Sequence, residues 1–346
     1  MRRLNFTVDA GTHRERGAVA FLTAILMTAL LAFGAIAVDG GLLFAERAQL
    51  QSGADAAALA LAQKCAASTA DPACQEGSSL AEELADSNAG DAASLISSLA
   101  VDTSARRITV VTGALEAGAR PGAVALYLAN ILGNSEAEVG ARAGAVWGSP
   151  SAGRTAFPLA FSVCQVQGFV DGGLQLLQEH GKNINADCNY GPSGAVTPGG
   201  FGWLVQDAGQ CGGSIDVALA EGGSDPGNNA PGNCSGVLNT WASDIEAGKP
   251  VTVLLPVFTA VTGTGSSAVY SLLGFAAYSV VGWKFSGDSG LPYTFRNQYP
   301  SVPASLECQG NCRGIVGKFI TYVSLADGYT LGPVDGLGTR VVRITR

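Results

Sequence analysis

Residues Ala18–Val38 read AVAFLTAILMTALLAFGAIAV, an uncharged run of 21 residues, and this stretch decides how the rest of the chain is interpreted. As an α-helix rising about 1.5 Å per residue, it extends about 30 Å, the hydrocarbon thickness of a bilayer. A helix also satisfies every backbone N–H and C=O group internally, as lipid requires. The run therefore predicts a transmembrane helix over residues 18–38.

The charges on the two sides of this run predict its orientation. Arg14 and Arg16 precede it, and the acidic residue Asp39 follows it. Because basic flanks remain in the cytoplasm, residues 1–17 are predicted to be a cytoplasmic leader and residues 39–346 to lie outside the membrane.

The run has two other interpretations. A buried core helix is a poor one, because an uncharged run of this length between arginines exceeds what a core helix needs. A secretory signal cleaved after Ala37 is the second, since Ala35-Ile36-Ala37 is an A-x-A site. Against cleavage, the run is longer than the usual apolar core of a signal peptide. A retained anchor is favoured, and the cleaved form stays an alternative.

Composition bounds the class of protein. The 346 residues include 47% hydrophobic and only 14% charged residues, and the net charge is −8. This balance fits a folded, loop-rich chain. Beyond the basic leader the chain is acidic with scattered Lys and Arg, so nucleic-acid binding is excluded as a function.

The cysteines indicate an oxidising compartment. Their number is even and all of them follow the apolar run, which is the pattern of an exported, disulfide-bonded protein. Local bonds are expected between Cys65 and Cys74 and between Cys308 and Cys312, and Cys211 and Cys234 are expected to hold the loop Glu221–Gly236. The full set of disulfide candidates is Cys65, Cys74, Cys164, Cys188, Cys211, Cys234, Cys308 and Cys312.

The segment after Asp39 reads GGLLFAERAQLQSGADAAALALAQKCA and is rich in helix-forming residues. Its apolar residues fall on one stripe at helical spacing, which predicts an amphipathic stem that continues the transmembrane helix and ends before Asp71-Pro72. The stripe consists of Leu43, Leu50, Ala54, Ala57 and Leu61. Its small residues suit either the core of the chain's own domain or close contact with a partner helix.

Several motifs resemble one known family. Arg14–Ala20 reads RERGAVA, the apolar run ends in Val38–Gly41 (VDGG), and Ala45–Ala60 reads AERAQLQSGADAAALA. Together they are similar to the N-terminus of TadE/TadG-like Flp (Tad) pilus-assembly proteins. The resemblance implies a pilin-like unit that closes with a short helix at 125–133 and a strand at 139–145. It also implies a Glu five residues after Gly17 in processed pseudopilins. Leu22 stands at that position, which favours the TadG-like role of a retained anchor.

The exported part is expected to hold two units. Residues 39–149 form a pilin-like α+β stem domain, with helices at 79–88 and 122–132 and strands at 106–112 and 138–147. Residues 148–153 are a linker by composition. Residues 154–346 form a mainly β, disulfide-containing domain. Its expected strands are 251–258, 269–281, 314–323 and 339–344, and 269–281 is too short to span a bilayer.

No catalytic, cofactor or metal site is predicted. His180 is the one His in the exported part, and no G-x-S-x-G motif accompanies it. Cys308 and Cys312 lack the C-x-x-C spacing of zinc sites, and the oxygen-rich loop 221–229 lacks EF-hand spacing. The protein is therefore expected not to be an enzyme and to need no cofactor.

The fold class expected is α+β, with an N-terminal transmembrane helix, a pilin-like stem with a small sheet, and a mainly β domain. The function expected is that of a single-pass, extracytoplasmic structural component of Flp/Tad pilus assembly or of the cell envelope. Its expected partners are the cytoplasmic membrane, pilus-assembly or envelope proteins and, as a further option, copies of itself. A secreted binding protein and an exported enzyme are the alternatives.

Overall fold

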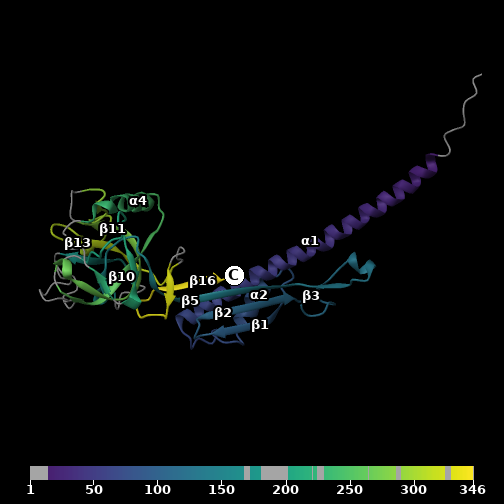
Figure 1. The fold of residues 1–346 in the computed structure, drawn as a ribbon, viewed down its shortest axis with the longest axis horizontal. Coiled ribbons are helices and arrows are strands. Elements are labelled where there is room, and N and C mark those ends of the chain that lie inside the picture. Colours follow the sequence, from purple (N-terminus) through teal and green to yellow (C-terminus); the bar gives the residue numbers. More distant parts are fainter. Residues whose placement is uncertain are drawn as a thin grey trace, which may run out of the picture.

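The computed structural model contains one very long helix followed by a body built mainly of β-strands (Figure 1). It describes residues 15–166, 172–180, 202–219, 221–223, 230–263, 265–285, 290–323 and 329–345. The long helix, α1, runs without interruption from Glu15 to Ala67. At about 1.5 Å per residue it is about 80 Å long, and its N-terminal half projects away from the body (Figure 1). The predicted α+β class is confirmed.

The two halves of α1 have different surroundings. None of the described side chains between Val19 and Val38 is buried, and α1 is the one helix in the described part of the chain that is long and apolar enough to cross a membrane. From Leu50 onward, one side of the helix is buried in a core. The predicted continuation of the apolar helix into an amphipathic stem is therefore correct, and Gly40-Gly41 does not interrupt it.

The stem half of α1 lies on the first sheet, which has seven strands among the described residues. The strand order is β1-β2-β5-β16-β14, and β15 and β8 also pair with β5. The strands are β1 (Ser94–Asp102), β2 (Arg107–Ala114), β5 (Gly140–Arg154), β8 (Ser214–Asp216), β14 (Tyr322–Val323), β15 (Thr330–Gly332) and β16 (Arg340–Thr345).

The core beneath this sheet explains the alanines of the stem. Ala54, Ala57 and Ala58 are fully buried against β2 and β5, where the bulky Trp147 is also buried. Small side chains let the helix approach the sheet closely. Of the two roles expected for the small residues of the stem, packing in the chain's own core is therefore confirmed, and these residues are not free to contact a partner helix. The second helix, α2 (Ser79–Asn88), has the predicted bounds and packs beside α1.

The helix predicted at 122–132 is wrong. The chain there forms β3 (Ala123–Ala125), the 3₁₀ helix η2 (Ala129–Leu132) and β4 (Glu136–Glu138), and β3 pairs with β4 as a hairpin. The backbone N–H groups that a helix would use donate instead to carboxylates: Ala125 donates to Glu116, and Tyr127, Leu128 and Ala129 donate to Asp39. Contacts distant in sequence therefore override the local helix preference.

The second sheet also has seven strands among the described residues, in the order β6-β10-β11-β13-β7, with β12 and β9 pairing with β11. The strands are β6 (Phe161–Ser162), β7 (Gln175–His180), β9 (Glu221–Gly223), β10 (Val251–Thr262), β11 (Val269–Lys284), β12 (Thr294–Phe295) and β13 (Arg313–Phe319). Two helices accompany them, α3 (Val163–Val166) and α4 (Ser235–Glu246). Short 3₁₀ helices are η4 (Val217–Leu219), η5 (Gly232–Cys234), η6 (Gly265–Ser267) and η7 (Ala304–Leu306).

An aromatic core fills the space between this sheet and α4. Trp241 of α4 meets Trp283 of β11 edge to face at 6.0 Å between ring centroids, and Phe157 contacts both Trp203 and Trp241. Large aromatic side chains bury much apolar surface for their number, which suits a chain rich in glycine. The mainly β disulfide-containing part is thereby confirmed, and the segment 269–281 is a mostly buried strand as predicted.

Two further predictions about organisation are wrong. Residues 148–153, expected to be a linker, lie within the long strand β5, whose far end pairs with β15 and β8. The C-terminal strand β16, expected in the second unit, pairs antiparallel with β5 in the first sheet. A stretch rich in glycine and serine is typical of a linker, but here the missing side chain lets β5 and β15 approach each other closely. A Cβ on Gly148 would overlap the carbonyl oxygen of Gly332 in β15.

Candidate functional site

The first candidate site lies where the apolar half of α1 ends. Asp39, only 6% exposed, directs both carboxylate oxygens at the turn before η2. Its Oδ1 accepts a hydrogen bond from the Tyr127 N–H at 3.1 Å, and its Oδ2 accepts from Leu128 at 3.1 Å and from Ala129 at 2.6 Å. Hydrogen bonds to a charged acceptor are stronger than neutral ones. We call this set of contacts the Asp39 clamp.

The hairpin held by the clamp also has an apolar attachment to α1. Val124 of β3 and Val139, which directly follows β4, are buried together with Leu50 of α1 and Ala141 of β5. Its stem is charged, since Arg120 Nε lies 2.7 Å from Glu136 Oε2. In Figure 1 the hairpin labelled β3 extends beside α1, away from the sheets. The hairpin is therefore fixed to the helix at its base and at its tip.

An acidic group lies close to this junction. Glu46, on the next turns of α1, has its pKa raised above 4.5, first by burial and then by the negative charges of Asp91 and Glu116. Desolvation and like charges both disfavour the ionised form. The fold therefore disfavours the ionised form of Glu46.

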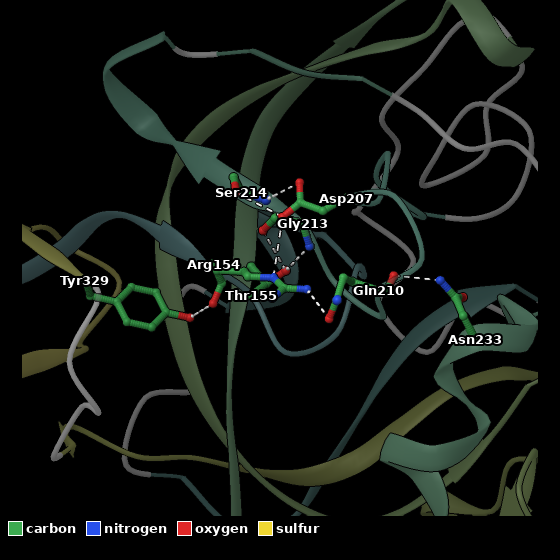
Figure 2. Close-up of polar contacts among 8 residues, drawn as sticks. All are labelled: Arg154, Thr155, Asp207, Gln210, Gly213, Ser214, Asn233 and Tyr329. Atoms are coloured by element: carbon green, nitrogen blue, oxygen red, sulfur yellow. Dashed lines mark hydrogen bonds and ion pairs between the residues drawn. The ribbon is translucent and has the colours of Figure 1, made fainter.

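The second candidate site is a polar cluster at the far end of β5 (Figure 2). Arg154 lies 3.4 Å (Nε) from Asp207 Oδ2 and donates a hydrogen bond from Nη2 to Gln210 Oε1 at 2.9 Å. Asp207 also accepts from the backbone N–H and the hydroxyl of Ser214. Asn233 Nδ2 donates to the carbonyl of Gln210 at 2.6 Å. These bonds tie the loop between Trp203 and β8 to β5 on one side and to the start of α4 on the other.

The backbone beneath this cluster is closely packed. Thr155 and Gly213 exchange hydrogen bonds through their backbone groups and the threonine hydroxyl, and the Tyr329 hydroxyl donates to the carbonyl of Arg154. Burial raises the pKa of Tyr329. Gly212 has φ +91°, and a Cβ there would overlap the carbonyl oxygen of Thr155, so this position requires glycine.

A surface hollow of about 430 Å³ opens beside the cluster. Gln210, Asn233, Thr240 and Trp241 line it, together with the disulfide-bonded Cys211. Amide and hydroxyl groups beside an indole suit hydrogen bonding and apolar contact with a protein surface. The charged groups nearby are paired within the chain, so the arrangement suits recognition rather than proton transfer.

The structure places the disulfide candidates as follows. Among the described residues, three bonds join Cys65 to Cys74, Cys211 to Cys234, and Cys308 to Cys312. These are the pairs that sequence spacing suggested. Cys164 is also disulfide-bonded, and Cys188 lies outside the described residues. The first bond closes the end of α1, and the second fixes the loop of the polar cluster to α4.

His180 ends β7, paired in register with Arg313. Residues 224–229 of the oxygen-rich loop lie outside the described residues. Within the described ranges, no group of three or more His, Cys, Asp or Glu side chains is placed to hold a metal ion.

Sequence reasoning did not identify the two polar sites. Asp39 appeared only as part of the VDGG motif and as a flanking charge, and its acceptor role depends on a turn almost ninety residues away. Arg154, Asp207 and Gln210 carry no local motif. A buried carboxylate directed at successive backbone N–H groups becomes visible only when the fold is known.

Comparison with known proteins bears on α1. No curated protein and no solved structure matches the chain. Residues 17–64 match the family model described as "Putative Flp pilus-assembly TadE/G-like". This segment lies entirely within α1 and contains the apolar run, Asp39 and the buried alanines of the stem. Over this part of α1 the chain is therefore similar to TadE/G-like Flp pilus-assembly proteins.

Proposed function

We propose that the protein is a TadG-like, single-pass membrane component of the Flp/Tad pilus-assembly apparatus that acts through protein–protein contacts. Its N-terminal leader stays in the cytoplasm, α1 crosses the membrane, and the disulfide-bonded body lies outside. The body has a structural role and carries out no catalytic turnover.

One observation carries this proposal. α1 is continuous from Glu15 to Ala67, with none of the described residues covering its apolar half and with a folded sheet packed on its other half. Exposed side chains between Val19 and Val38 would be costly in water, and lipid removes that cost. A single rigid helix would thus join the membrane to the body, at the segment that matches a pilus-assembly family.

The orientation is supported by charge and by cysteine placement. Arg14 and Arg16 precede the apolar run, and such residues favour the cytoplasmic side. The disulfides of the described residues all lie beyond the run, where an exported body would meet an oxidising environment.

Anchoring and orientation can be tested on the full chain in cells. Carbonate-washed membranes should retain the intact protein, and protease added outside the cytoplasmic membrane should digest the body. Reversing the leader charges (Arg14→Glu with Arg16→Glu) should reduce the fraction of correctly oriented body, whereas the matched pair Arg106→Glu with Arg107→Glu, in the body, should not. A soluble mature form that begins at Val38 would contradict the anchor and support the secreted alternative.

The assembly role needs a separate test. A strain lacking the protein should lose surface pili, and the wild-type chain should restore them. We expect Thr240→Arg, which fills the hollow beside Trp241, to restore fewer pili than Thr252→Arg, an exposed control on β10. Normal piliation in the deletion strain would refute the pilus role, and full rescue by Thr240→Arg would remove the hollow as a contact surface.

A further inference from the structure

The tip of the β3–β4 hairpin has two exposed apolar side chains, and it lies beside the end of the apolar half of α1. Tyr127 is 66% exposed and Ile131 is 81% exposed, although the inner residues Val124 and Leu126 are buried. Between Arg120 and Glu136 the sequence contains no charged residue. We call the exposed Tyr127 and Ile131, with the turn between them, the hairpin tip.

The Asp39 clamp fixes the height of this tip along α1. Asp39 follows Val38, the last residue of the apolar run, and its oxygens are within 2.6–3.3 Å of the backbone nitrogens of residues 127–129. Val38 is itself exposed. If the apolar half of α1 lies in lipid, the hairpin tip lies where the helix leaves the hydrocarbon.

We propose that the hairpin tip is a second membrane contact, which inserts Tyr127 and Ile131 into the interfacial region of the bilayer beside α1. The inference rests on the proposed membrane anchoring. Lipid is the occupant that fits, because a tyrosine and an aliphatic side chain on an uncharged turn match the interface, where aromatic rings with a polar end gather. Arg120 and Glu136, the charged residues that bound this uncharged stretch, are paired with each other at 2.7 Å from Nε to Oε2.

Such a contact would limit the tilt and rotation of α1 as well as its depth in the bilayer. A single helix can tilt and rotate in a bilayer, and interfacial anchors limit both motions. A hairpin clamped to one side of α1 and resting in the same interface would set the rotation of the helix. The body would then present a fixed face to its surroundings.

Depth-dependent fluorescence quenching tests the proposal on the full chain in lipid nanodiscs. A genetically encoded dansyl amino acid replaces one residue at a time: Ile131 at the tip, Leu30 inside the apolar run, or Leu219 as an aliphatic control. Leu30 is 70% exposed and Leu219, on η4 of the body, is 72% exposed, so neither probe disturbs a core. Nitroxide groups are placed either near the headgroups or near the chain ends of the lipids.

The three positions give distinguishable outcomes. We expect the Ile131 probe to be quenched more by the shallow nitroxide, consistent with a depth of ~5–10 Å for interfacial side chains. The Leu30 probe should respond more to the deep nitroxide, and the Leu219 probe to neither. Quenching at Leu30 with an Ile131 probe that behaves like the Leu219 probe would overturn the hairpin contact alone, and would leave a protein partner as its occupant. Loss of quenching at Leu30 would instead refute the anchor.

Discussion

Replacing Asp39 tests whether one carboxylate holds the hairpin to the long helix. Asp39→Ala removes the acceptor from three successive backbone N–H groups, those of Tyr127, Leu128 and Ala129. A hydrogen bond to a charged group contributes about 1.5–3 kcal/mol, but the three share one carboxylate and water can reach the opened turn. We therefore expect the local opening free energy to fall by about 2–4 kcal/mol, less than the sum of separate bonds.

The assay is amide hydrogen exchange on the full chain in nanodiscs. Because 1.4 kcal/mol is a tenfold change in an equilibrium constant, exchange at residues 127–129 should become about 30- to 1000-fold faster. Asp39→Asn should give a smaller acceleration, since the amide keeps one acceptor oxygen but turns a donor towards one of the N–H groups. Amides in β2, within the stem core, should be unaffected.

A matched control lies on the same helix. Asp55 accepts one hydrogen bond, from Gln51 Nε2 at 3.0 Å, so Asp55→Ala should change stability by no more than about 0.5 kcal/mol. Equal exchange at residues 127–129 in Asp39→Ala and in the wild type would refute the clamp. So would an acceleration spread evenly over the whole body, since that result would mean global unfolding rather than release of the hairpin.

Three further predictions follow from packing and charge. Gly212→Ala should destabilise the body more than Gly209→Ala. Both positions have positive φ, which costs about 1–2 kcal/mol for alanine, but only at Gly212 would the Cβ overlap a backbone carbonyl. Equal melting temperatures of the two variants would contradict this prediction. Ala57→Leu should lower stability by about 1–3 kcal/mol through overpacking, whereas the exposed Ala48→Leu on the same helix should be nearly neutral in chemical denaturation. Glu46→Gln should be more stable than the wild type at pH 7 by a few tenths of a kcal/mol after solvent screening. The reason is that the pKa of Glu46 is raised in the folded state, so the stability of the wild type falls as pH rises from 4.5 through the folded pKa. The advantage of the variant should disappear below pH 4.5, and an advantage that grows in acid would contradict this prediction.

Elements with a strong local pattern could be predicted from the sequence. α1 followed from an uncharged run joined to an alanine-rich stripe, and α2 at 79–88 and the strands β2, β10 and β11 followed from periodicity and β-branched residues. Each of these patterns lies within the residues of the element itself. The sequence therefore predicted the secondary structure of these segments, but not which other segments they contact.

The errors have one physical cause, which is contact between distant segments. The turn at 127–129 is held by Asp39, and the Gly-Ser-Pro stretch at 148–153 becomes a strand because β15 and β8 pair with it. Strand β1, which was not predicted, is the exception: it is serine-rich, and its partner β2 is the next strand along the chain. Helix α4 was not predicted either, because a glycine-rich loop precedes it and its core contacts are with a distant sheet.

Much of the segment that matches the family can be accounted for by the proposed membrane anchoring and by contact with the rest of the chain. Under the proposed anchoring, its exposed apolar residues between Val19 and Val38 face lipid. Asp39 holds the hairpin, and the alanines Ala54, Ala57 and Ala58 let the sheet lie close to the helix. These side chains are thus committed to lipid or to the chain itself, and the alanines are not available to a partner helix. Under the proposed function, recognition of a pilus or envelope protein must therefore use other exposed surface, such as Phe44 of α1, which is 79% exposed, or the surface of the body. The C-terminal strand β16, paired with β5, lies in the first sheet, which packs on α1, so under the proposed anchoring a force on that sheet would reach the membrane through the helix.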